Sequence, residues 1–119
     1  MTKGEKLERE REDIFVKELA KEIAEKMKAL GLQIGPYTIK VDGRLRVCGG
    51  LCTYYPKTKD YTIKISRDVV RHETEETTRK VIAHELLHAC YPESSFMDHG
   101  ATFRHYVRCL NDAGIVCCE

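Results

Sequence analysis

The sequence predicts an α+β fold built as one domain. Three observations predict it: apolar residues recur every three or four positions over residues 5–30, they alternate with polar ones over residues 36–66, and helical spacing returns after Ser66. A helix, a run of strands and further helices in this order are typical of an α+β domain. A chain of 119 residues can bury one hydrophobic core but not two of ordinary size, so we expect residues 1–119 to form a single domain.

The first expected element is a long amphipathic helix over residues 5–30. Glu, Lys and Arg occupy most of the positions between its apolar residues, as on a helix with one face in water. Gly31 follows directly and Pro36 comes soon after, which predicts that the helix ends there. The expected apolar face consists of Leu7, Ile14, Phe15, Leu19, Ile23, Met27 and Leu30.

Residues 36–66 are expected to form three or four short antiparallel strands. Tyr37, Ile39 and Val41 alternate with polar residues, and the Asp-Gly pair at 42–43 is typical of a tight hairpin turn. The Gly-Gly pair at 49–50 breaks or bulges the next strand, and residues 56–60 turn the chain into a last strand. The pattern therefore predicts a small antiparallel meander.

Two more helices are expected after the strands. Thr74 suits the N-cap of a helix running to about Cys90, because acidic residues fill its first turn and Pro92 prevents its continuation. The last helix is expected to begin near Asp98 and to end at Gly114. Its inner face would carry Phe103, Val107 and Leu110.

Composition and charge exclude some classes of protein. No apolar run approaches the ~20 residues that cross a bilayer, so no membrane association is expected. The charge-rich stretch at residues 1–15 carries no export or transit signal, which favours a cytoplasmic location. The net charge of +1 does not indicate a nucleic-acid-binding protein as a whole. Lysines and arginines at 40–46 and 57–64 form local basic clusters, for which a solvated strand surface is the preferred interpretation.

The six cysteines are expected to be free thiols, since a chain without an export signal meets a reducing environment. A second zinc site built from Cys48, Cys52, Cys117 and Cys118 is the alternative. It is less favoured, because these spacings lack the paired CxxC units of structural zinc sites.

The strongest chemical signal is the stretch VIAHELLHAC at residues 81–90. His84 and His88 are four positions apart, so on a helix they rise from the same face and can hold one ion. Glu85 would lie beside that ion, where a carboxylate can take a proton from a bound water. Two histidines and a glutamate on an apolar helix are costly to bury unless something satisfies them. Hydrogen-bonded histidines without a metal are the alternative.

A catalytic zinc takes three protein ligands and keeps a position for water. Downstream candidates for the third ligand are His99, His105, Glu93 and Asp98. His99 is favoured because it follows a short turn after Pro92 and can project back toward the motif helix from the start of the last helix. His105 is interpreted as an outer or surface residue, and His72 as a surface residue.

HELLHA at residues 84–89, followed by HGATF at 99–103, resembles the SprT-like metalloproteases. The resemblance covers roughly residues 14–112. It implies that His84, His88 and His99 bind one catalytic zinc ion and that Glu85 is the general base. It also implies protein substrates, among them proteins bound or crosslinked to DNA, and DNA as a further partner in repair. The metzincin pattern is excluded, since Tyr91 and Ser94 stand where it requires glycine and histidine.

The sequence thus predicts a zinc metalloprotease hydrolysing peptide bonds in proteins. Its long N-terminal helix and motif helix would pack on the small sheet, and the C-terminal helix would close the metal site. A non-catalytic zinc-binding module or a nucleic-acid-binding adaptor is the alternative, which the presence of Glu85 disfavours. Candidate donors to the transition-state oxyanion are Tyr54, Tyr55, Tyr61, Tyr91 and Arg104.

Overall fold

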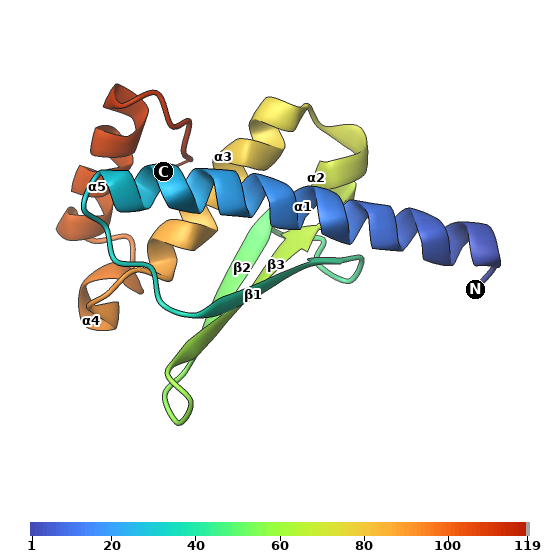
Figure 1. Cartoon of the computed structure of the whole chain (residues 1–119), viewed down its shortest axis with the longest axis horizontal. Coiled ribbons are helices and arrows are strands. Elements are labelled where there is room, and N and C mark those ends of the chain that lie inside the picture. The colour runs from blue at the N-terminus through green and yellow to red at the C-terminus, as the bar shows by residue number, and fades with distance from the viewer. Residues whose placement is uncertain (119) are drawn as a thin grey trace.

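The computed structural model describes residues 1–118, which form an α+β fold with one sheet of three strands (Figure 1). The elements are α1 (Lys3–Ala29), β1 (Tyr37–Asp42), β2 (Gly50–Tyr55), β3 (Asp60–Ser66), α2 (Arg67–His72), α3 (Glu75–His88), α4 (Glu93–Phe96) and α5 (Ala101–Asp112). Helices α4 and α5 gather at the end of α3 that lies away from α2 (Figure 1). Within residues 1–118, no helix is both long and apolar enough to cross a membrane.

The sheet is mixed, so the predicted antiparallel meander is wrong. The strand order is β1-β3-β2, with β1 parallel to β3 and β2 antiparallel to β3. Residues 43–49 form no hairpin; instead they carry the chain from one edge of the sheet to the other, while Asp42 Oδ1 accepts a 2.8 Å hydrogen bond from Arg44 N. Alternation determines which side chains face the core, but it does not determine which strand is the neighbour.

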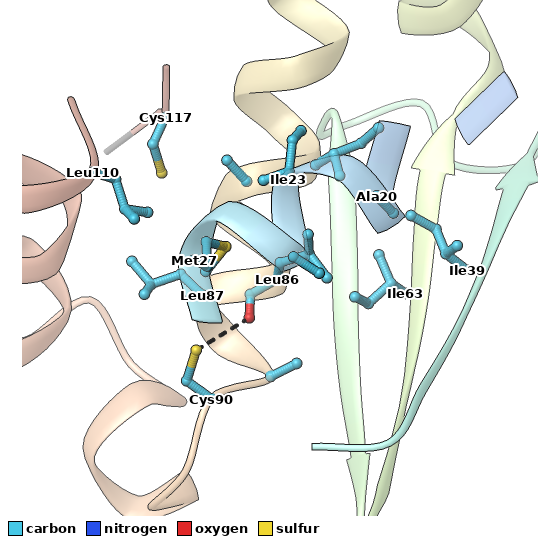
Figure 2. Close-up of a cluster of buried hydrophobic side chains, with 14 of the residues drawn as sticks. Ala20, Ile23, Met27, Ile39, Ile63, Leu86, Leu87, Cys90, Leu110 and Cys117 are labelled. Carbon is cyan, nitrogen blue, oxygen red and sulfur yellow. Dashed lines mark hydrogen bonds between the residues drawn. The ribbon is translucent and has the colours of Figure 1, made fainter. Parts of the chain in front are cut away.

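One face of the sheet is covered by helices α1 and α3. Alternate residues of β1 and β3 are buried there, namely Ile39, Val41, Tyr61, Ile63 and Ile65. Figure 2 shows Ile23 and Met27 of α1 close to Leu86 and Leu87 of α3 in the same cluster. Helix α1 packs chiefly on β1 and α3 chiefly on β2, while β3 lies between these two strands.

Helix α1 has nearly its predicted length, but its buried face differs from the expected one. Val16, Ala20 and Ala24 are buried together with Leu19, Ile23 and Met27. Leu7 and Ile14 are instead 50% and 54% exposed. Small alanines allow α1 to approach its neighbours closely, whereas spacing alone favoured the larger residues.

The N-terminal half of α1 is tied to the sheet and to α2 by charged groups. Val41 N at the outer edge of β1 donates to Asp13 Oδ1 at 2.9 Å, which satisfies a backbone donor on an edge strand. Buried Glu12 accepts hydrogen bonds from Arg67 Nε at 3.1 Å and from Arg71 Nε at 2.6 Å. These contacts connect α1 to the end of the sheet where the chain enters α2.

The start of the motif helix is confirmed: Thr74 is its N-cap, and Thr74 Oγ1 accepts from Thr77 N at 3.2 Å. The last helix begins at Ala101 rather than near Asp98, because Asp98 Oδ1 instead accepts from Gly100 N at 3.0 Å in a turn. Helices α2 and α4 were not predicted, since they are too short to show a helical period. Gly31 and Gly114 follow the ends of α1 and α5 with φ of +92° and +85°, as expected of helix stops.

Candidate metal centre

Three histidine side chains converge from two segments of the chain. His84 and His88 come from α3, and His99 comes from the turn before α5. His99 Nε2 lies 3.1 Å from His84 Nε2 and 3.0 Å from His88 Nε2. All three nitrogens lie within 4.8 Å of one another. A tetrahedral ion with Zn–N bonds of about 2.0–2.1 Å needs its nitrogens about 3.3 Å apart, so the two distances to His99 Nε2 need to lengthen by only a few tenths of an ångström. The three imidazoles therefore fit one zinc ion.

The other ring nitrogen of each α3 histidine is held by a backbone carbonyl. His88 Nδ1 lies 2.7 Å from Phe96 O, and His84 Nδ1 lies 2.9 Å from Cys118 O. A carbonyl oxygen only accepts, so each Nδ1 carries the proton and each Nε2 presents its lone pair to the centre. This is the arrangement that a histidine needs to bind a metal through Nε2.

Phe103 of α5 forms the apolar support under all three imidazoles. Its ring is fully buried, and its centroid lies 5.0, 4.4 and 5.0 Å from those of His84, His88 and His99. The His88 ring stacks on it with an interplanar angle of 24°. Helix α5 thus restricts the rotation of the histidine rings by direct packing.

Burial favours the neutral state of the α3 histidines. It lowers the pKa of His88 to about 4, and it lowers the pKa of His84 despite the opposing effect of the carbonyl hydrogen bond. Only the unprotonated imidazole binds a metal, so both residues are in their ligating form at neutral pH.

Glu85 is the acidic group of the site. The residue is 6% exposed, and burial raises the pKa of its carboxyl to about 7. A Cβ atom placed at Gly50 on β2 would lie 3.0 Å from Glu85 Oε2, so the first residue of β2 borders the carboxylate directly. A group with this pKa can both take up and release a proton near neutral pH.

The site opens into a cleft of about 460 Å³ between α3 and the free edge of β2. Its walls include the three histidines, Glu85, Val81 and Met97, together with residues 48–52 and Cys118. None of the tyrosines or the arginine considered as oxyanion donors is among these lining residues. Tyr61 is buried instead against Tyr54 and Tyr91, with ring centroids 4.9 and 6.1 Å away.

The remaining metal-ligand candidates lie elsewhere. Within residues 1–118, the three histidines are the one group of at least three His, Cys, Asp or Glu whose ligand atoms lie within 4.8 Å of one another. The four cysteines considered for a second zinc site therefore do not form such a group. His105 is exposed, with its Nε2 3.6 Å from Cys109 Sγ, and His72 is exposed at the end of α2. Asp98 holds the turn before α5 through Gly100 N.

Comparison of the sequence with known protein families gives one match. The model of the SprT-like family matches residues 15–118, which include all three histidines, Glu85 and Phe103. No significant match to a curated protein or to a solved structure was found.

Proposed function

The chain belongs to the SprT-like family, and on this premise we propose that it is a zinc-dependent metallopeptidase that hydrolyses peptide bonds in proteins. One observation supports the proposal most directly. Three Nε2 atoms converge in a cleft, with the buried carboxyl group of Glu85 next to them on the same helix. Three protein ligands and an adjacent carboxylate suit a catalytic zinc, whereas a structural zinc is usually enclosed by four ligands.

In the proposed reaction, the zinc ion and the side chains of the site have separate roles. Zinc, when bound, would polarise the scissile carbonyl and acidify a water molecule. His84, His88 and His99 would hold the ion. Glu85 would accept the proton of the attacking water and then deliver it to the leaving nitrogen, which its pKa of about 7 permits.

The edge of β2 supports binding of an extended peptide. Among the described residues, strand β2 pairs with β3 alone, and its other edge faces the cleft. An edge of this kind presents backbone donors and acceptors to which a further strand can bind. A substrate segment can add to this edge as a further strand, which would place its backbone beside Glu85. Leu51, 44% exposed on β2, offers an apolar contact to a substrate side chain.

The test compares Glu85→Gln and His99→Ala with the unchanged protein. We expect about one zinc per chain in the unchanged protein and in Glu85→Gln, and loss of zinc in His99→Ala. Cleavage of an unfolded protein substrate should fall at least about 100-fold in Glu85→Gln, since the residue transfers the proton. Undiminished cleavage in that variant, or zinc that does not depend on His99, would contradict the proposal. A zinc-loaded protein that cleaves no substrate would favour the non-catalytic alternative.

We further propose that the substrates include proteins bound to DNA. A pocket of about 570 Å³ at the far end of β1 supports this, because basic side chains dominate its lining. They are Arg9, Lys40, Arg44, Arg46, Lys64, Arg67, Arg71 and His72. Residues 43–49 link this pocket to the cleft: Arg44 and Arg46 line the pocket, and residues 48–49 line the cleft. Phosphates bound at the pocket would therefore lie near the peptide-binding edge.

Binding of labelled DNA tests this second proposal separately. Arg44→Glu with Arg46→Glu should weaken binding and reduce its salt dependence, since fewer phosphates are then neutralised. Lys57→Glu with Lys59→Glu is the matched control, because these lysines lie in the turn at the other end of the sheet. Equal weakening of DNA binding by both double substitutions would mean that binding depends on the net charge of the protein and not on the pocket. No binding at low salt would remove DNA from the proposal and leave the peptidase proposal intact.

A further inference from the structure

The segment after α5 returns to the metal centre. We call residues 115–118 the strap. Ile115 N donates to Leu110 O at 2.8 Å, and Cys118 N donates to Lys80 O at 3.3 Å, so the strap runs from the end of α5 to the middle of α3 (Figure 1). Ile115 and Cys117 are each only 7% exposed, and Cys117 lies near Leu110 in the core (Figure 2). The strap is therefore packed at both ends.

One side chain holds both backbone groups of Cys117. Asn111 Oδ1 accepts from Cys117 N at 3.2 Å, and Asn111 Nδ2 donates to Cys117 O at 3.2 Å. The same Nδ2 also donates to Val107 O at 3.0 Å, which anchors the amide on the preceding turn of α5. An amide is required for this pattern, because it combines an acceptor with two donors. Asn111 thus determines where the next residue, Cys118, presents its carbonyl.

That carbonyl is the partner of His84 Nδ1, at 2.9 Å. We infer that Asn111 and the strap are positioning groups for the metal ligand His84: they hold its proton on Nδ1 and direct Nε2 into the centre. The inference rests on the proposed zinc site. Asn111 is not among the residues that line the cleft, and within residues 1–118 its side-chain hydrogen bonds go to Val107 and Cys117, so it acts through the backbone of Cys117 and Cys118.

The strap orients His84 but not His88, because the two histidines have different carbonyl partners. The carbonyl that holds His88 Nδ1 belongs to Phe96 of α4, eight residues further along the chain. The partner of His84 lies 34 residues away and is held in place by Asn111. Loss of the strap would therefore release His84 while leaving His88 oriented. Partners of this kind typically change metal affinity about 10-fold to 100-fold when they are removed.

The test uses Asn111→Asp, which has the same shape but replaces the donating NH2 group with an acceptor facing two carbonyls. Asp112→Ala is the matched control, on the next residue of α5 and exposed to solvent. Two quantities are measured on the full chain. The first is zinc affinity, by competition with a chelator. The second is the position of the imidazole protons in the zinc-free protein, by proton–nitrogen NMR, with His84→Gln used to assign the signals.

We expect zinc affinity to fall about 10-fold in Asn111→Asp and to stay unchanged in Asp112→Ala. In the NMR spectra, the His84 proton should be confined to Nδ1 in the unchanged protein and distributed over both nitrogens in Asn111→Asp. The His88 signals should not change, since Phe96 O still holds that ring. If Asn111→Asp does not fold, the same measurements are made on Asn111→Ala. This substitution leaves no cavity in the core, because residue 111 is exposed.

A folded Asn111 variant with unchanged zinc affinity and an unchanged His84 proton would overturn the inference. Equal loss of affinity in Asp112→Ala would also overturn it, since a general weakening of α5 would then be the cause. If the unchanged protein binds no zinc, the proposed function fails, and the NMR comparison still decides whether the strap positions His84.

Discussion

Gly50 lies directly against Glu85. A Cβ atom at residue 50 would stand 2.8 Å from Glu85 Cγ and 3.0 Å from Glu85 Oε2, which is closer than side-chain atoms pack. The sequence indicated only that the Gly-Gly pair interrupts a strand. The structure gives another reason for glycine at residue 50: it lets the edge of β2 approach the carboxyl group that we propose as the proton acceptor.

Replacing Gly50 should therefore impair the reaction without removing the ion. In Gly50→Ala the added methyl group displaces the Glu85 side chain, and a displacement near 1 Å can reduce catalysis about 100-fold. Steady-state cleavage rates and zinc content measure the two effects separately. Thr53→Ala, on the same strand but outside the cleft lining, is the control and should retain its activity. Equal activity of both variants would show that the approach of β2 to Glu85 has no catalytic consequence.

Phe103 should support zinc binding as well as the core. Phe103→Leu removes the ring on which His88 stacks, whereas Ile39→Val shortens a buried side chain of β1 that lies outside the cleft lining. Each substitution should lower the free energy of unfolding by about 1 kcal/mol, measured by urea denaturation. Only Phe103→Leu should also weaken zinc, by about 10-fold in chelator competition. If the two variants lose zinc affinity equally, the loss comes from general destabilisation of the fold.

Removal of zinc should lower the melting temperature. An ion that binds only the folded chain at 1,000 times its Kd adds about 4 kcal/mol to the free energy of unfolding. For a domain of this size we expect the midpoint to fall by about 15 °C on chelation, observed by scanning calorimetry. His99→Ala should melt at one temperature with or without the chelator. A chelator effect that persists in His99→Ala would mean that the stabilising ion binds elsewhere.

Glu12 should make the stability depend on pH in the acid range. Burial raises its pKa, but hydrogen bonds from Arg71 and Arg67 outweigh this effect and hold the pKa below its ordinary value. A group whose pKa is lower in the folded state stabilises it above the unfolded-state pKa of about 4.3, and this contribution is lost as the pH falls through the lower folded-state value.

Glu12→Gln should thus lower the free energy of unfolding by about 1–3 kcal/mol at neutral pH, measured by urea denaturation. The difference from the unchanged protein should shrink steadily below the ordinary carboxyl pKa of about 4.3. Glu18→Gln, on the exposed side of α1, is the control and should have little effect at any pH. A difference that stays constant across the acid range would contradict the role of the Glu12 ion pairs.

Local patterns predicted the parts of this molecule that depend on local geometry. The helical period located α1, α3 and α5, and the four-residue spacing placed His84 and His88 on one face of α3. The strand order could not be predicted, because β1 pairs with a strand 24 positions further along the chain, with Tyr37 opposite Tyr61. The alternation of apolar and polar residues does not indicate which strand is the neighbour. Likewise, Ala20 and Ala24 could not be assigned to the buried face until the packing of α1 was known.

In the metal centre, too, the features that depend on local sequence could be predicted and those that depend on tertiary structure could not. HExxH is a local pattern, and His99 could be favoured from the turn that precedes it. The carbonyl partners of these histidines could not be predicted, because every residue has a backbone carbonyl. Only the tertiary structure brings Phe96 O to His88 and Cys118 O to His84. The contact of Gly50 with Glu85 was hidden for a similar reason, because it joins a strand and a helix that are distant in sequence.

The distance along the chain between His84 and its carbonyl partner, 34 residues, also orders events in time. A ribosome makes the chain from its N-terminus, so α3 is synthesised before Cys118 has been added. Until then His84 lacks the group that orients it, and the centre is unfinished. The proposed zinc centre therefore takes its final form only after α5 and residues 115–118 have been made and have folded back against α3.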